Sequence, residues 1–371
     1  MNSKLTAAAS LCGMLAILPA SISAQQWSQS GPLPRAYHTA VWDAVTNKMI
    51  VFGGDTNTLS GPGVNQNDVW WLNNPGSVGV SWTKPQITGT KPAARSGPGT
   101  VYDPSSDRMI VFGGALGQAS PCASDVWALE NANGVGGTPQ WRELRPSGGP
   151  PLARTRFAAV YDPTTNTMII YGGNDCFSTE YGDVWTLTNA NGASGTPVWT
   201  QLFPTGTGPA GREDTSAVYD AASNRMILYG GALTSGSDPS VWVLTNANGS
   251  GGAPAWSQLP ISGTLPTARC CNSIVYDAAD NIAVIFGGEG ATGLLNDTWT
   301  LSSANGLGTP EWTQLNPAMT YGPEPRDFLS AVYNPSTNKM TIFGGGSAFV
   351  DSFGHTVNFE DVWVLANANG K

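Results

Sequence analysis

The chain has 371 residues, enough for one large domain or two ordinary ones, so length alone does not fix the number of domains. Its 46 glycines, 27 prolines and 14 tryptophans accompany only 12% charged residues, which is typical of short apolar strands joined by many tight turns. The formal net charge of −9 leaves no basic surplus to neutralise phosphates, and we therefore expect no nucleic-acid partner.

The first segment, residues 1–24, has the pattern of a secretory signal peptide. Lys4 supplies a positive charge, residues 5–18 are mostly apolar but too short to cross a bilayer, and small residues end at Ala24. No second long apolar run follows in the sequence. We therefore predict a secreted or periplasmic protein that is monomeric and free of the membrane once the signal is cleaved.

Six copies of one unit fill the rest of the chain. Each copy has an arginine, a strand ending in V-[YW]-[DN], a polar turn, an apolar strand ending in Gly-Gly, a variable loop and a [DST]-[VT]-W-x-L strand. Five copies then add another strand with a tryptophan. The first glycine of each pair follows the arginine by 18 residues, and successive units start 57 to 60 residues apart. The leading arginines are Arg35, Arg95, Arg154, Arg212, Arg269 and Arg326.

The third unit shows how the strands are assigned. Residues 155–161 and 184–187 are short and rich in apolar residues, and 168–171 is a continuous apolar run that predicts a fully buried strand. The Asn-Gly of Asn189–Gly192 predicts a hairpin that leads into a strand at 198–202. Four antiparallel strands per unit form one blade. We predict an all-β fold, a single six-bladed β-propeller over residues 25–371, with blades near 35–86, 95–145, 154–203, 212–260, 269–316 and 326–371.

The last unit has no fourth strand of its own before the sequence stops at Lys371. Residues 25–30 include Trp27 in an x-W-x-x pattern like that of the fourth strands. We therefore predict that this N-terminal strand completes blade six and closes the ring, which would remove the free sheet edges.

The arginine, the Gly-Gly pair, the D-V-W strand and the fourth-strand tryptophan resemble the repeat of the Kelch family over residues 27–371. Histidine follows the arginine in R-x-x-H form only in the first unit, and the Asn-Ala-Asn-Gly hairpins are longer than usual for the family. The resemblance implies a propeller that serves as an interaction scaffold. The chain has only two histidines, so the His-rich copper site of the related galactose oxidase cannot be assembled, and we expect no metal and no cofactor.

Two interpretations of the six arginines remain open: a ring that faces a ligand at the channel mouth, or structural pairing with a repeating carboxylate. Aspartates two residues before the third-strand tryptophan favour pairing. They are Asp68, Asp125, Asp183, Asp297 and Asp361, whereas blade four has Ser240 at this position and Asp238 nearby.

The three positions after each arginine differ from blade to blade, whereas the strand that follows hardly changes. A scaffold would repeat the same residue six times, but a binding pocket needs different groups from different directions. The candidate ligand-binding residues are Tyr37, His38, Arg156, Glu213, Asp214 and Asp327, together with His355 in the longest loop that follows a Gly-Gly pair. The alternative is that they are solvated loop residues.

Four cysteines lie beyond the signal segment. Cys122 and Cys176 occur in equivalent loops of neighbouring blades, which predicts a disulfide between them. Cys270 and Cys271 are adjacent, with Cα atoms about 3.8 Å apart, below the usual disulfide range. They are either a strained vicinal disulfide or two thiols.

The leading functional hypothesis is a binding module for an extracellular carbohydrate, glycoprotein or peptide, because no known catalytic motif occurs. The alternative is a sugar-active enzyme similar to the exported Kelch-type mutarotases and epimerases. These use acid–base residues and arginines at the channel mouth, roles that Arg212, Glu213 and Arg156 could fill. Catalytic residues are otherwise left unassigned.

Overall fold

A computed structural model describes residues 31–58, 61–117, 120–317, 321–350 and 356–371. Every regular element in these ranges is a strand. None of the described residues belongs to a helix long and apolar enough to span a membrane. The signal segment, the strand around Trp27 and His355 lie outside the described residues.

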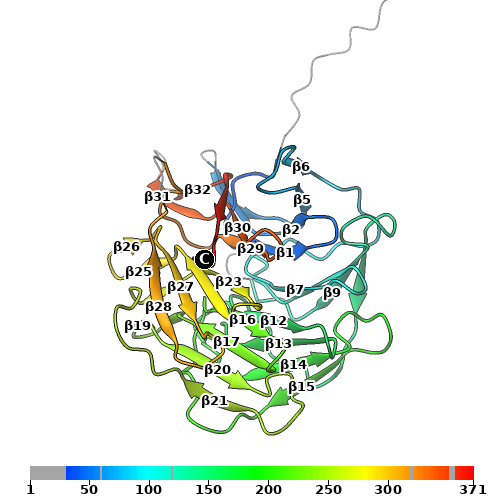
Figure 1. Cartoon of the computed structure of the whole chain (residues 1–371). Helices are drawn as coiled ribbons and strands as arrows, with labels where there is room; N and C mark the ends of the chain where they lie inside the picture. The colour runs from blue at the N-terminus through cyan, green and yellow to red at the C-terminus, as the bar shows by residue number, and fades with distance from the viewer. Residues whose placement is uncertain (1–30, 59–60, 118–119, 318–320, 351–355) are drawn as a thin grey trace, which may run out of the picture. The chain divides into compact units, whose positions relative to one another are not determined.

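Six antiparallel sheets contain the repeat (Figure 1). Their first strands are β1 (Thr39–Asp43), β7 (Gly99–Asp103), β12 (Ala158–Asp162), β16 (Ser216–Asp220), β23 (Ser273–Asp277) and β29 (Ser330–Asn334). The second strands are β2 (Lys48–Phe52), β8 (Arg108–Phe112), β13 (Thr167–Tyr171), β17 (Arg225–Tyr229), β24 (Ile282–Phe286) and β30 (Lys339–Phe343). The third strands are β5 (Val69–Asn73), β9 (Val126–Glu130), β14 (Val184–Thr188), β20 (Val241–Thr245), β27 (Thr298–Ser302) and β33 (Val362–Ala366). Five sheets have a fourth strand: β6 (Ser81–Thr83), β10 (Gln140–Leu144), β15 (Val198–Leu202), β21 (Ala255–Gln258) and β28 (Glu311–Leu315).

The first strands of successive sheets contact one another, and β29 contacts β1, so the sheets follow each other in a closed circle. The second strands are the most buried, as the continuous apolar runs predicted. The all-β propeller predicted from the repeat is confirmed. The predicted first strand of blade three began too early, because Thr155 pairs with Asn174 and Arg156 adopts φ 56° before β12 begins at Ala158.

Short hairpins in the loops after the Gly-Gly pairs rise on one side of the circle. They are β3 (Asp55–Thr58) with β4 (Gly61–Asn65), β18 (Ala232–Leu233) with β19 (Gly236–Ser237), β25 (Glu289–Gly290) with β26 (Gly293–Leu294), and β31 (Gly346–Val350) with β32 (Thr356–Asn358). The strand β22 (Arg269–Cys270) pairs with β25, and β11 (Ser147–Gly148) runs parallel to β15. The β31–β32 hairpin contacts β3 on one side and β26 on the other (Figure 1).

Neighbouring blades are joined by one repeated aromatic contact. The aromatic residue that ends a second strand packs against the fourth-strand tryptophan of the next blade, with ring centroids 4.8–5.3 Å apart, within the range of favourable aromatic pairs. The pairs are Phe52–Trp141, Phe112–Trp199, Tyr171–Trp256, Tyr229–Trp312 and Phe343–Trp82. Phe286 of blade five has no such partner among the described residues. It lines a cavity of about 360 Å³ that β28 and β33 also border, where the tryptophan of a fourth strand of blade six would lie.

Ring closure by residues 25–30 stays a prediction with a direct test. A chain that starts at Arg35 should lose about 2 kcal/mol of unfolding free energy, the order expected for burying one large apolar side chain. Urea denaturation of both chains measures this difference. Trp27→Ala in the longer chain should reproduce most of the loss, and equal stability of all three chains would contradict the closure.

Candidate functional site

The six leading arginines are buried, each at most 1% exposed. In every blade, one Nη atom donates to the carbonyl of the first glycine of the pair, 18 residues later, at 2.9–3.0 Å. This bond accounts for the constant spacing in the sequence. A Cβ on that glycine would also lie within 2.9 Å of the next arginine's carbonyl oxygen, so the position requires glycine.

The same guanidinium groups pair with carboxylates, and the geometry therefore supports the structural interpretation of the arginines. The partners are Asp68, Asp125, Asp183, Asp238, Asp297 and Asp361. Burial alone would raise the pKa of these carboxyls, but hydrogen bonds and charge from the arginines lower it below the ordinary value. In blade four, Asp238 replaces the carboxylate missing at Ser240, and the buried indole Nε1 of Trp242 lacks the hydrogen bond made in the other blades.

Two residues after each arginine, the backbone forms a closed circle of hydrogen bonds around the channel. Each N–H donates to the carbonyl of the equivalent residue in the preceding blade, at 2.8–3.1 Å, and all six residues have φ between 48° and 63°. We call this set the channel ring. Its members are Tyr37, Gly97, Arg156, Asp214, Cys271 and Phe328. The N–H groups of the channel ring are occupied by hydrogen bonds within the ring. A ligand at the mouth would therefore contact mainly the side chains of the ring.

Three of these side chains stack across the channel. The rings of Tyr37 and Phe328 lie 3.7 Å apart, and the Arg156 guanidinium lies 4.9 Å from the Tyr37 centroid and 5.7 Å from that of Phe328. Arg156 also contacts the Tyr37 hydroxyl at 3.4 Å. Burial raises the pKa of Tyr37 well above its ordinary value, so its hydroxyl remains protonated.

Two acidic side chains of blade four form ion pairs with Arg156. Its Nη1 lies 3.4 Å from the Glu213 carboxylate and 3.5 Å from that of Asp214. Burial raises the pKa of Asp214 to about 7, although Arg156 acts in the opposite direction. Asp214 can therefore exchange a proton near neutral pH.

Asp327 lies in a second part of the mouth, a cavity of about 540 Å³ that we call the acidic cavity. Carboxylates from three blades line it, namely Asp55, Glu289 and Asp327, with Tyr37 and Phe328 at its border. None of its described lining residues is a lysine or an arginine. Burial and the neighbouring Glu289 raise the pKa of Asp327 to about 6.

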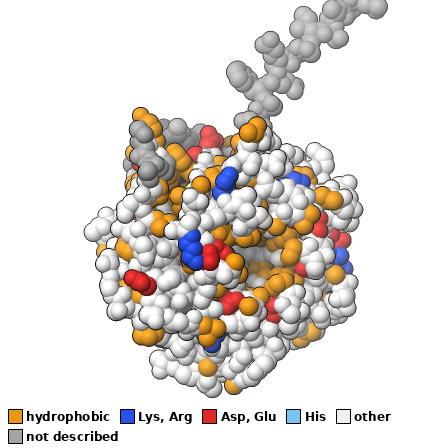
Figure 2. All heavy atoms as spheres, viewed as in Figure 1, with side chains coloured by type: hydrophobic (Ala, Val, Ile, Leu, Met, Phe, Trp, Pro, Cys, Tyr) orange, Lys and Arg blue, Asp and Glu red, His pale blue; other side chains and the backbone are white. Residues whose placement is uncertain are grey.

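The charged groups of this mouth do not continue between the first strands. A cavity of about 200 Å³ between the first strands has only uncharged lining residues, among them Ala40, Ala159, Ala217 and Ala331. Figure 2 shows the molecule in the view of Figure 1, with the C-terminus toward the middle of the picture. On the face drawn, charged side chains are few, and some acidic and basic groups lie beside a central hollow.

His38 does not join the other candidates. Its side chain is buried against Phe343, both ring nitrogens lack hydrogen-bond partners among the residues that the structure describes, and burial lowers its pKa to about 3. The hypothesis that His38 contacts a ligand does not fit this placement. The equivalent residues Phe157 and Leu329 are also buried, a pattern that the sequence contained. The other candidate histidine, His355, lies outside the described residues.

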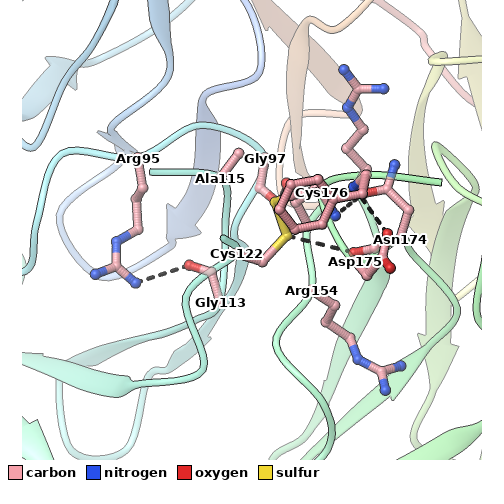
Figure 3. Close-up of a disulfide and its surroundings, with 12 residues drawn as sticks. Arg95, Gly97, Gly113, Ala115, Cys122, Arg154, Asn174, Asp175 and Cys176 are labelled. Atoms are coloured by element: carbon pink, nitrogen blue, oxygen red, sulfur yellow. Dashed lines mark hydrogen bonds between the residues drawn. A yellow bond between two sulfur atoms is a disulfide. The ribbon is translucent and has the colours of Figure 1, made fainter. Parts of the chain in front are cut away.

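The predicted Cys122–Cys176 disulfide is present, with a Cα–Cα distance of 5.4 Å. It joins the loops after the Gly-Gly pairs of blades two and three (Figure 3). Cys176 adopts φ 69°, and its amide is held by the Asn174 side chain. The bridge therefore fixes one section of the rim around the channel.

Phe328 is the residue of the mouth that was not among the sequence-based candidates. Phe328 occupies the same position after its arginine as Tyr37 and Arg156, so position alone could have identified it. Asp55 and Glu289 each follow a Gly-Gly pair directly, and both enter the acidic cavity. That repeated position was the available signal.

Antiparallel sheets in a circle, each with a buried arginine bonded to a glycine carbonyl and an aspartate, define a β-propeller built from Kelch repeats. The chain belongs to the Kelch-repeat family. The family described as the KLHDC2/KLHL20/DRC7 Kelch-repeats domain matches residues 14–134, 45–188 and 107–252.

Similar proteins support the same assignment. Host cell factor 2 of Homo sapiens is 24% identical over 370 residues, covering 91% of this chain and 43% of that protein. The host cell factor homolog hcf-1 of Caenorhabditis elegans is 32% identical over 152 residues, covering 38% of this chain and 18% of that protein. The chain thus spans less than half the length of these relatives. The solved structure of YjhT aligns with a TM-score of 0.60 and 13% identity over 90% of this chain and 95% of that one, a likeness of fold.

Proposed function

We propose that this Kelch propeller is an extracellular interaction module that binds a positively charged group of a peptide or protein at the channel mouth. The observation that carries the proposal is the acidic cavity, in which Asp55, Glu289 and Asp327 meet without a lysine or arginine among the described lining residues. Its volume of about 540 Å³ is within the usual range for ligand pockets.

The chemistry of the cavity favours a cation over an anion. A unit positive charge 4 Å from one carboxylate gains about 4 kcal/mol at an effective dielectric near 20, before desolvation is subtracted. An acidic sugar would meet the same three carboxylates and be repelled. Neutral carbohydrate hydroxyls could donate hydrogen bonds to them, so a neutral glycan or glycoprotein is the competing ligand class.

A thermal-shift screen separates these ligands. We expect lysine- and arginine-containing peptides to raise the melting temperature, and the same peptides with acetylated lysine to have little effect. Stabilisation by neutral sugars alone would replace the peptide hypothesis with a carbohydrate one. Stabilisation by acidic sugars alone would contradict the role of the acidic cavity.

Binding of a cationic peptide should strengthen as the pH rises from about 5 to about 7. Asp327, whose pKa is about 6, is largely protonated and neutral at the lower pH and gives up its attraction for the cation. Calorimetric titration across this range measures the effect. Asp327→Asn should flatten the profile, and an unchanged profile in that variant would assign the pH dependence to another group.

Acid–base catalysis on a sugar is the second candidate, and one observation favours it. The pKa values of Asp214 and Asp327, about 7 and about 6, suit proton transfer near neutral pH. Arg156 beside Asp214 could then hold a developing negative charge. NMR of sugar anomers with and without the protein tests this candidate. Faster interconversion that is lost in Asp214→Asn would support catalysis, whereas binding without turnover would support the interaction module.

A further inference from the structure

The adjacent cysteines of blade five lie at the channel ring and have no role in the proposed binding site. Cys270 ends β22, opposite Glu289 of β25, and Cys271 is the ring member of this blade. Of the two alternatives for this pair, the structure has two free thiols. Both side chains are buried, each 7% exposed, and their Sγ atoms lie 2.6 Å apart. Cys271 also lines a cavity of about 140 Å³ with Arg156 and Asp214.

A metal site is one use for these thiols, because the two Sγ atoms and a Glu289 carboxylate oxygen lie within 4.8 Å of one another. Two thiolates on a tetrahedral zinc ion at about 2.3 Å each would stand about 3.8 Å apart. The observed 2.6 Å is much shorter than this, and shorter than the contact distance of about 3.5–4.0 Å between non-bonded carbon atoms. It is nearest to the covalent disulfide length of about 2.05 Å. The distance is too short for a shared tetrahedral metal and longer than a disulfide, so the two free thiols stand close enough to be joined without a metal between them.

The charges around the pair also favour a neutral product. Burial raises the pKa of Cys271 well above its ordinary value, and the nearby Asp214 and Asp327 act in the same direction. A negatively charged thiolate is disfavoured beside these carboxylates, whereas a disulfide is neutral and is not repelled by them. The same shift predicts that oxidation through Cys271 is slow near neutral pH and faster at higher pH, because the thiolate is the nucleophile.

We propose that Cys270 and Cys271 form a reversible vicinal disulfide at the channel ring by exchange with a low-molecular-weight disulfide. One cysteine loses its proton, attacks a sulfur of the small disulfide and releases the first small thiol. The neighbouring cysteine then loses its proton and attacks the mixed disulfide, which releases the second. The two protein thiols are oxidised by two electrons, and the small disulfide is reduced to two thiols that take up the two protons.

Formation of this bond changes the hydrogen bonding of Asp214. Cys271 and Asp214 line the same cavity of about 140 Å³, so a Cys271 thiol in the reduced chain can donate to the Asp214 carboxyl, and such a bond lowers the pKa of that carboxyl. The disulfide has no S–H to donate. The oxidised chain should therefore have a higher Asp214 pKa than the reduced chain, so that redox state alters the protonation of the channel mouth.

Peptide mapping of the unmodified chain tests the bond itself. The folded protein is incubated with hydroxyethyl disulfide and then denatured without reductant. Iodoacetamide is present during denaturation to alkylate free thiols, and the chain is then cleaved with trypsin. The peptide from Cys270 to Arg326 contains these two cysteines and no internal lysine or arginine. We expect it to be unalkylated and two hydrogen atoms lighter than its dithiol form, whereas a sample reduced beforehand should carry two alkyl groups.

Several outcomes would overturn the proposal. They are two alkyl groups after oxidation, a stable mixed disulfide on either cysteine, or a cross-link to Cys122 or Cys176. Zinc protection of the reduced thiols from alkylation, reversed by a chelator, would assign the pair to a metal site. A second readout tests the coupling to Asp214 by NMR titration of its carboxyl carbon, assigned by comparison with Asp214→Asn. Its pKa should rise on oxidation, and an unchanged or lower value would refute the coupling.

Discussion

Replacing Asp183 with alanine should lower the free energy of unfolding by about 3–5 kcal/mol, because removal of one partner leaves a buried charge unpaired. That charge belongs to Arg154, which is 0% exposed and bonds both carboxylate oxygens of Asp183 at 2.6 and 3.0 Å. The remaining hydrogen bonds of Arg154, to the carbonyls of Gly172 and Leu152, and its contact with the Tyr181 ring cannot replace an anion. Urea denaturation measures the loss.

An exposed ion pair provides the matched control. Arg145 and Glu143 lie 3.5 Å apart, and the Arg145 side chain is 86% exposed. Glu143→Ala should therefore cost less than about 1 kcal/mol, since solvent screens such pairs. If Asp183→Ala and Glu143→Ala had equal effects, the buried arginines would not be the structural element that we assign to them.

The double substitution of Cys122 and Cys176 by serine should lower the unfolding free energy by about 4 kcal/mol. The bridge closes a loop with a sequence separation of 54 residues, and removing it restores the chain entropy of that loop in the unfolded state. Guanidinium denaturation under non-reducing conditions compares the two chains.

Reduction of the unsubstituted chain is the control for this experiment. Full reduction with dithiothreitol should bring its stability close to that of the double variant, since both lack the same cross-link. An unsubstituted chain that is no more stable than the variant before reduction would contradict a stabilising role for the bridge.

The fold was predictable because its determinants repeat. Each Arg–Gly pair at a spacing of 18 residues corresponds to a hydrogen bond that recurs in every blade, and each fourth-strand tryptophan with an aromatic partner contacts the preceding blade. The substitution of Asp238 for the missing carboxylate at Ser240 could be suspected from proximity in sequence. These features are local or periodic, so they can be recognised in a single sequence.

The channel ring was less predictable, because its backbone conformation is imposed from outside the local sequence. Tyr37, Arg156, Asp214 and Phe328 all adopt the left-handed conformation that glycine prefers, and only Gly97 among the ring members indicates it. The bond from each blade to the next holds this conformation. The residue type at these positions differs from blade to blade. The ring positions therefore do not stand out as part of the repeat in the sequence.

Prediction of the acidic cavity would have required knowledge of which blades are neighbours. Asp55, Glu289 and Asp327 come from blades one, five and six, which are consecutive only when the ring is closed. His38 is the opposite case. Its polarity suggested a ligand contact, but its place just before β1 directs the side chain into the core.

The most direct test of the proposed function is calorimetric titration of a lysine-containing peptide, selected by the thermal-shift screen, into three chains. Asp327→Asn should weaken binding about tenfold, equivalent to about 1.4 kcal/mol. Glu311→Gln, which removes the same charge from the exposed strand β28, should leave the dissociation constant unchanged. Equal dissociation constants for all three chains would contradict binding of the cation in the acidic cavity.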